Sequence, residues 1–256
     1  HAALYELPWY MMIGNPAAGK SSAIQNSGLR FPFAENNKQK AAIQGIGGTR
    51  NCDWSFSTEG ILLDTAGRYS VYEEDHKEWL GFLGLLKKSR KKAPINGIII
   101  GVSIAELMSN NPEHALKLAK NLRSRVQDLT EQLEVFAPVY IIFTKMDLVA
   151  GFSEFFSVYD EDERQQVWGA TIPYQETGDK DASSHFDEQF NLLYDGLQDL
   201  STTHLTRRHS QTISPSVMTF PLEFKSIKPA LKLFISALFE ENPFQFQPVF
   251  RGFYFT

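Results

Sequence analysis

Short apolar runs alternate with amphipathic stretches over residues 5–150 of the chain. The apolar runs have the length of buried strands, and polar residues, Gly or Pro bound them. The amphipathic stretches place their apolar side chains on one helical face. This alternation predicts an α/β fold with a mostly parallel sheet and helices on both faces. The predicted strands are residues 7–13, 51–57, 60–64, 95–104 and 139–143, with helices at 21–28, 69–92 and 112–134.

The second half of the chain is less regular. Asp160 and Glu163 predict a helix with a capping box, and an apolar stripe from Phe186 to Leu205 predicts a longer helix. We expect a last strand at 217–224 and a last helix at 229–239. The predicted organisation is a core of residues 1–150 and 216–241, a helical insertion at 151–215, and an aromatic tail at 242–256 leading into the next domain. Residues 244–255 of this tail could form a strand.

Composition excludes some classes of protein. The 256 residues carry a formal net charge of -5, are 43% hydrophobic and include one cysteine, Cys52. This charge argues against a nucleic-acid binder, and one cysteine excludes an intramolecular disulfide. The apolar runs are too short to span a bilayer. Because the chain begins at His1 without methionine, we expect a piece of a longer protein whose membrane segments lie outside it.

Residues 14–21 match the phosphate-loop (Walker A) pattern G-x-x-x-x-G-K-[ST] at every fixed position. A strand runs into the loop and a helix leaves it, so backbone amides and the helix N-terminus can surround a polyphosphate. Lys20 would bind the β- and γ-phosphates, and Ser21 would ligate Mg2+. The alternative is a chance glycine-rich turn. The residues expected to bind the nucleotide phosphates are Gly14, Asn15, Ala17, Ala18, Gly19, Lys20, Ser21 and Ser22.

A second element of a phosphate site comes after the predicted strand 60–64. The strand delivers Asp64 and, three residues later, Gly67 to its carboxyl end. An acidic residue there can hold Mg2+ through water, and the Gly67 amide can sense a γ-phosphate. The alternative is a strand-ending turn without a ligand.

Thr144, Lys145, Met146 and Asp147 resemble the base-recognition motif N-K-x-D of GTP-binding domains. The Lys145 stem would lie over the base, and the Asp147 carboxylate would accept two hydrogen bonds from guanine. A carboxylate would meet no matching donor pair on adenine. Thr144 replaces the usual Asn, which weakens the inference of guanine preference. A polar strand end with a salt bridge is the alternative.

Residues for hydrolysis are less clear. Thr49 comes after a glycine-rich stretch and is expected to ligate Mg2+ only when a γ-phosphate is present, with loop capping as the alternative. Many GTPases have Gln after the D-x-x-G sequence, where this chain has Arg68. A guanidinium cannot accept a proton, but it could stabilise transition-state charge, as could Arg50. The predicted catalytic residues are therefore Lys20, Gly67 and Arg68.

The helix predicted at 69–92 ends in a basic run, residues 87–92. We expect a solvated helix end favoured by the helix dipole, and the alternative is contact with an anionic membrane or acidic partner.

The order of these elements resembles that of a P-loop small-GTPase-like domain. Longer stretches of the sequence resemble one particular family. The chain resembles the cytoplasmic domain of the IcmF/TssM family over nearly its whole length. The matching strings are residues 7–10, 48–54, 63–69, 144–152, 166–169 and 251–256.

This resemblance implies a place in bacterial secretion. Family members are inner-membrane proteins of type VI secretion systems, with relatives in type IV systems, and their nucleotide-binding domain lies in the cytoplasm. The implied partners are TssL-like and TssJ-like subunits and cytoplasmic baseplate components, with the membrane reached only through segments outside this chain.

We therefore expect a domain that binds Mg2+ with GTP or ATP and hydrolyses it slowly to switch conformation during assembly of the secretion apparatus. Two alternatives stay open. One is a non-hydrolysing structural docking module, and the other is an ATPase that powers assembly.

Overall fold

The computed structural model of the chain describes residues 5–32, 51–109, 111–157, 159–164, 166–174, 180–207 and 215–256. Its strands are β1 Trp9–Ile13, β2 Cys52–Phe56, β3 Ile61–Thr65, β4 Gly97–Ser103, β5 Pro138–Thr144, β6 Gly169–Thr171 and β7 Val249–Phe255. Its α-helices are α1 Lys20–Gln25, α3 His76–Ser89, α4 Ile104–Leu107, α5 Pro112–Leu133, α6 Phe152–Phe156, α7 Glu161–Arg164, α8 Ala182–Arg207 and α9 Pro215–Leu238.

The strands form one sheet in the order β2-β3-β1-β4-β5-β7-β6. The inner strands run parallel, while the edge strands β2 and β6 run antiparallel to β3 and β7. The predicted mostly parallel sheet is therefore confirmed, and the strands predicted at 51–57 and 60–64 form an antiparallel hairpin, β2 and β3.

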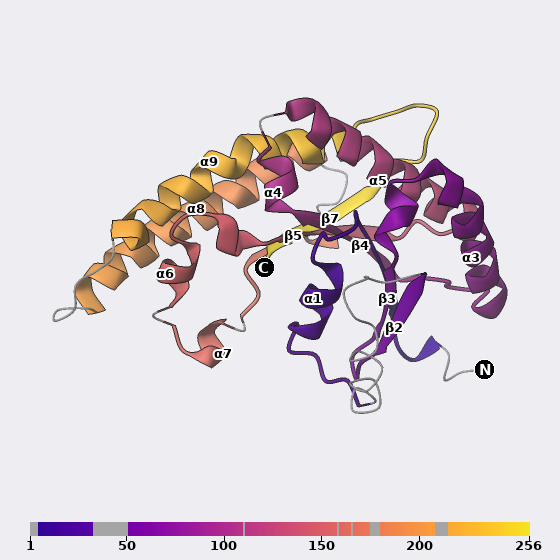
Figure 1. Ribbon diagram of the computed structural model, residues 1–256, viewed down its shortest axis with the longest axis horizontal. Helices are drawn as coiled ribbons and strands as arrows, with labels where there is room; N and C mark the ends of the chain where they lie inside the picture. Colours follow the sequence, from indigo (N-terminus) through magenta and orange to yellow (C-terminus); the bar gives the residue numbers. More distant parts are fainter. Residues whose placement is uncertain are drawn as a thin grey trace.

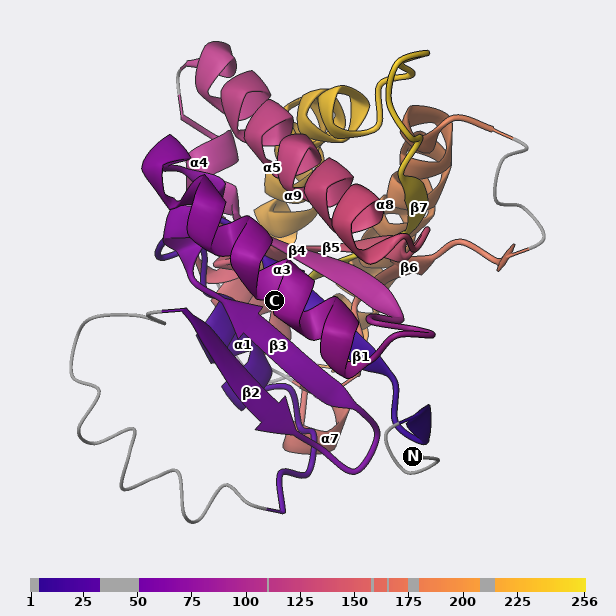
Figure 2. The same cartoon turned by 90° about the vertical axis from the view of Figure 1, so that its right-hand side faces the viewer.

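Helices cover both faces of the sheet, as expected. From β1 the chain first moves toward β3 and later returns past β1 to β4 and β5. Because crossovers are right-handed, α1 lies on one face, and α3 and α5 lie on the other (Figure 1). The turned view shows α3 and α5 packed side by side (Figure 2).

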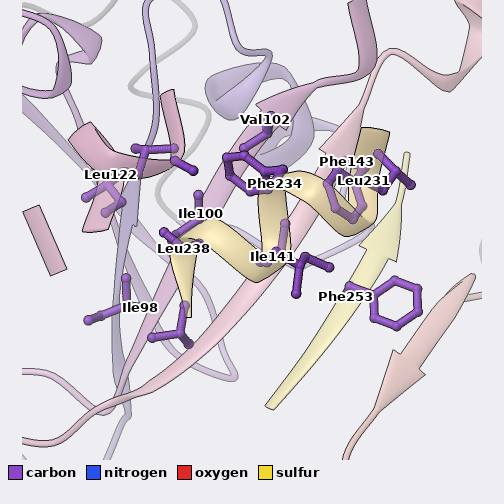
Figure 3. Close-up of a cluster of buried hydrophobic side chains, with 14 of the residues drawn as sticks. Ile98, Ile100, Val102, Leu122, Ile141, Phe143, Leu231, Phe234, Leu238 and Phe253 are labelled. Carbon is purple, nitrogen blue, oxygen red and sulfur yellow. The ribbon is translucent and has the colours of Figure 1, made fainter. Parts of the chain in front are cut away.

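The main core lies between the sheet and the larger helical layer (Figure 3). Alternate residues of β4 and β5 point to this face, as the twofold period of a strand requires. Helices α5 and α9 pack against them. The labelled side chains of this cluster are Ile98, Ile100, Val102, Leu122, Ile141, Phe143, Leu231, Phe234, Leu238 and Phe253.

The predicted strand at 217–224 is wrong, because α9 runs continuously from Pro215 to Leu238. The helix predicted at 229–239 is confirmed as far as Leu238, but it begins earlier, at Pro215, so Pro221 and Pro229 both lie inside it. The buried residues recur at helical spacing, and they pack against α5 and α8, which run beside α9 (Figure 1). Tertiary packing therefore keeps the helix continuous despite two prolines.

The expected aromatic tail at 242–256 contains β7, which lies inside the sheet between β5 and β6. Strand β6 belongs to the region expected to form an insertion, and it pairs with β7 at the sheet edge. Phe186 and Phe190 of α8 pack against Phe253 and Phe255 of β7. Both regions therefore contribute to the same sheet and core.

The predicted capping box is confirmed. The Glu163 amide donates to Asp160 Oδ1 at 2.8 Å, and the Asp160 amide donates to Glu163 Oε2 at 3.2 Å. Among the residues that the structure describes, no helix is long and apolar enough to cross a membrane. The predicted loop at 34–48 lies outside the described residues, as do Thr49 and Arg50.

Candidate phosphate-binding site

The phosphate loop connects β1 to α1 at the carboxyl edge of the sheet. Gly14 has φ 152°, and a Cβ atom there would lie 2.2 Å from the carbonyl oxygen of Gly101 on β4. Only glycine fits so close to the neighbouring strand. Ala17 and Gly19 have φ values of 59° and 79°, so the backbone turns tightly before α1 begins. Within the loop Ala18 is buried, while Ala17, Ser21 and Ser22 are exposed.

Lys20 is buried at the centre of this loop. Its Nζ donates hydrogen bonds to the carbonyl oxygens of Gly14 at 3.1 Å and Asn15 at 3.2 Å. Burial lowers the pKa of Lys20, and the nearby Asp64 and Glu106 carboxylates oppose this shift. An ammonium group has three donors, so these two bonds leave one for a ligand.

The structure brings together two of the three predicted Mg2+ ligands. Ser21 Oγ donates a hydrogen bond to Asp64 Oδ2. Asp64 lies on β3, which pairs with β1, and is 2% exposed. Cys52 on the neighbouring strand β2 lies close to the same carboxylate. Burial is the main reason that the pKa of its thiol is raised to about 12, and the negative charges of Asp64 and Asp53 add to this shift. A hydroxyl and a carboxylate are oxygen donors of the kind that Mg2+ prefers.

Gly67 packs directly on the phosphate loop. A Cβ atom on Gly67 would lie 2.2 Å from the backbone nitrogen of Pro16 and 2.6 Å from the carbonyl carbon of Asn15. Any side chain at this position would therefore push the loop away. Asp64 and Gly67 therefore both contact the phosphate loop, Asp64 through Ser21 and Gly67 through the backbone of Asn15 and Pro16.

Arg68 is held by carboxylates. Its guanidinium donates to Asp75, to Glu78 at 2.7 Å and to Asn51 at 3.0 Å, and it lies over the ring of Tyr69. Two carboxylates therefore already neutralise the charge that was expected to act in hydrolysis, and a catalytic role for Arg68 stays a prediction.

Thr144 stands where the base motif usually has Asn, and it makes a hydrogen bond that holds the phosphate loop. Its hydroxyl donates to the carbonyl oxygen of Ala18 at 2.6 Å and lies 3.3 Å from that of Val102. Lys145 comes next, with a left-handed φ of 63°, and is half-buried, while Asp147 is exposed. The end of β5 therefore touches the loop, and base recognition by Lys145 and Asp147 stays a prediction.

Sequence reasoning missed Glu106, which lies on α4 just after β4. Glu106 Oε1 accepts a hydrogen bond from Nδ2 of Asn15 at 3.0 Å, across 91 residues of sequence. Its position in the sequence could have identified it, because the carboxyl ends of parallel strands form the edge where α/β proteins bind ligands. The apolar run 95–104 indicates a buried strand, and a carboxylate two residues beyond its carboxyl end is a candidate for this edge.

A separate hollow of about 460 Å³ opens on the sheet face that carries α1. Tyr10, Ile99, Tyr140 and Tyr254 line it, and none of the predicted site residues does so. The polar, charged groups of the loop, and not this apolar hollow, have the chemistry of a phosphate site. The described residues also hold no group of three or more His, Cys, Asp or Glu side chains arranged for a metal ion.

Known proteins support the family assignment. Residues 72–256 match the family model described as the IcmF-related N-terminal domain. The chain is 42% identical over 262 residues to the type VI secretion system component TssM1 of Pseudomonas aeruginosa. That alignment covers 99% of this chain and 23% of TssM1, so the chain spans less than a quarter of this relative.

Solved structures give weaker similarity. The signal recognition particle receptor SRb-GTP/SRX complex from Chaetomium thermophilum has a TM-score of 0.38 and 19% identity, covering 56% of this chain and 72% of that chain. The SRb-GDP structure from the same organism has a TM-score of 0.35 and 17% identity, covering 56% and 62%. These scores are low, so the α/β assignment rests on the observed strand order. The family match, by contrast, extends over most of the chain, which belongs to the IcmF/TssM family through its IcmF-related N-terminal domain.

Proposed function

We propose that this chain is a nucleotide-binding domain that takes Mg2+ with GTP or ATP at the loop of residues 14–21. One observation supports this most strongly: the buried Lys20 lies within a tight loop beside the hydrogen-bonded pair of Ser21 and Asp64. A buried cation and a helix N-terminus together favour an anion. Gly67 packs on the same loop, where its amide would meet the γ-phosphate.

Ser21 and Asp64 are the residues that would hold Mg2+. When bound, the ion would neutralise charge on the β- and γ-phosphates. A site with one carboxylate and one hydroxyl suits Mg2+, which takes its remaining ligands from water and phosphate. Thr49 would add a ligand that depends on the γ-phosphate.

The similarity to TssM1 supports a role in type VI secretion. The domain would lie on the cytoplasmic side of the bacterial inner membrane, and the full-length protein would contact TssL-like and TssJ-like subunits and baseplate components. Slow hydrolysis or switching would couple the nucleotide to assembly. Hydrolysis is expected to be slow because Arg68 replaces a water-orienting Gln and is bound by Asp75 and Glu78.

Binding measured by titration calorimetry tests this function. Mg-GTP and Mg-ATP are each titrated into the wild-type chain, Lys20→Ala and Lys120→Ala, the last being an exposed lysine on α5. Removing a charge-assisted phosphate contact should weaken binding about 10- to 100-fold in Lys20→Ala. Lys120→Ala should bind as the wild type does.

The titration also separates the alternatives. Equal binding by Lys20→Ala and wild type, or no binding by the wild type, would contradict the proposal and favour a docking module without nucleotide. Preference for GTP over ATP that disappears in Asp147→Asn would support guanine recognition. Preference for ATP would favour an ATPase that powers assembly.

A further inference from the structure

Glu106 belongs to the phosphate loop in space although it lies far from it in sequence. It comes after β4, which pairs with β1, and its Oε1 accepts a hydrogen bond from Nδ2 of Asn15 at 3.0 Å. Asn15 is the second residue of the loop, and its backbone also packs against Gly67. Asn15 therefore contacts both Glu106 and the glycine expected to sense the γ-phosphate.

Several polar atoms at this place are buried without a hydrogen-bond partner among the described residues. They are Oε2 of Glu106, Oδ1 of Asn15 and Oγ of Ser103. Ser103 is 1% exposed, and it pairs in register with Thr144, whose hydroxyl donates to the Ala18 carbonyl of the loop. A buried polar atom without a partner costs about 1–3 kcal/mol, so such atoms need an explanation. A bound water and a ligand would supply the partners.

The charged groups around Lys20 also place Glu106 in the phosphate site. Glu106 and Asp64 are the two carboxylates that act on the Lys20 ammonium. Asp64 is already engaged by the Ser21 hydroxyl, and one oxygen of Glu106 is fixed by the Asn15 amide. The remaining Glu106 oxygen thus lies in the electrostatic reach of the lysine expected to bind phosphate.

We propose that Glu106 is the general base for nucleotide hydrolysis and that Asn15 is its positioning residue. This inference rests on the proposed function. Glu106 Oε2 would accept a proton from a water molecule while the water oxygen forms a bond to the γ-phosphorus. The bond from that phosphorus to the β–γ bridging oxygen breaks, its electron pair leaves with the nucleoside diphosphate, and the proton passes on to inorganic phosphate.

Glu106 supplies the proton acceptor that Arg68 lacks. A guanidinium has no acceptor for a water proton, whereas a carboxylate accepts through both oxygens. The Asn15 amide orients the carboxylate by binding one oxygen, and this leaves the other for water.

Single-turnover hydrolysis and equilibrium binding of Mg-GTP and Mg-ATP test the proposal on the wild-type chain, Glu106→Gln, Glu106→Asp, Asn15→Ala and Glu113→Gln. Glu113 is an exposed glutamate at the start of α5, so it controls for the same chemical change away from the loop. Glu106→Gln should slow hydrolysis about 100-fold or more, the range of general-base catalysis. Its binding should equal or exceed that of the wild type, because a negative charge near the triphosphate is removed. Glu113→Gln should change neither quantity.

Asn15→Ala should slow hydrolysis about 3- to 10-fold, the effect of one lost hydrogen bond, while binding stays within about twofold. A purely structural role for the pair would instead weaken binding in both variants. If Glu106→Gln does not fold, Glu106→Asp keeps the charge with a shorter reach and should slow hydrolysis with binding intact.

The outcomes separate this proposal from the function on which it rests. Wild-type chain that binds no triphosphate contradicts both. Wild-type chain that binds but does not hydrolyse contradicts the general base alone. Hydrolysis by the folded Glu106 variants within about threefold of wild type would also overturn the role of Glu106.

Discussion

Thr144 shows how one side chain can replace a missing one. The absence of Asn from the base motif suggests a loop without its brace, but the Thr144 hydroxyl donates to Ala18 in the middle of the loop. Thr144 is 3% exposed, so this hydrogen bond is made in a dry environment. The loop is therefore fixed to β5 independently of any base.

Replacing Thr144 by Val tests this brace. The change keeps the shape but leaves the Ala18 carbonyl without its donor, so we expect the free energy of unfolding to fall by about 1–2 kcal/mol. Thr144→Ser keeps the hydroxyl and is the matched control, with a loss of under about 1 kcal/mol for one methyl group. Urea denaturation measures both. Equal stability of Thr144→Val and wild type would show that the contact contributes nothing.

The sequence was informative about those site residues that lie within local motifs. The phosphate-loop residues, Asp64 and Gly67 meet as expected, because each motif has a fixed place at the end of a strand. Glu106 was missed because its contact with Asn15 depends on β1 and β4 being neighbours, which no local pattern states. The carboxylates that bind Arg68 lie close to it in sequence, Asp75 at the end of a short 3-10 turn and Glu78 in the first turn of α3, but no motif marks them as partners of an arginine.

At the scale of elements, the end of α3 differs from the expectation. The sequence predicts that the basic run 87–92 is solvated, and Lys88, Lys91 and Lys92 are indeed exposed. Arg90 instead is 1% exposed. It donates to Oδ1 of Asn96 at 2.9 Å and to the carbonyl oxygen of Leu7 at 3.2 Å. Its guanidinium also lies over the rings of Trp9 and Tyr5.

Arg90 therefore joins the end of α3 to the start of β1. We expect Arg90→Ala to lower the free energy of unfolding by about 2–4 kcal/mol, because two hydrogen bonds are lost and a buried cavity forms, although Asn96 Oδ1 still accepts from the Trp9 amide. Lys88→Ala, an exposed change in the same run, should cost less than about 0.5 kcal/mol. Urea denaturation measures the free energy of unfolding of both variants. A similarly small decrease in each would contradict a stabilising role for the buried Arg90.

The helix α9 marks the limit of prediction from local signals. Pro229 suggests a helix start and the apolar stretch at 217–224 suggests a strand, since single apolar runs do not distinguish the two. Contacts with α5 and α8 decide the structure there. Strands and helices of the first 150 residues are easier to predict, because polar turns separate them and their periods are clear.

At the scale of the whole molecule, the two halves of the chain build one sheet. Strand β7, near the end of the chain, lies between β5 and β6, and its register with β5 extends from Val249 to Phe255. The position of such a strand is a long-range property, which the alternation of apolar and polar residues cannot give. The fold class was predictable, while the place of the last strand was not.

The carboxyl ends of β1, β3, β4 and β5 surround the phosphate loop, so a nucleotide there should affect one edge of the sheet and leave the layer of α8 and α9 unchanged. Hydrogen–deuterium exchange of the wild-type chain, with and without Mg-GTP or Mg-ATP, tests this most directly. We predict slower amide exchange in residues 14–22 and 64–67 and, at a nucleotide concentration near the wild-type Kd, much weaker protection in Lys20→Ala. Binding that protects other segments, or leaves residues 14–22 unprotected, would contradict a nucleotide site at this loop.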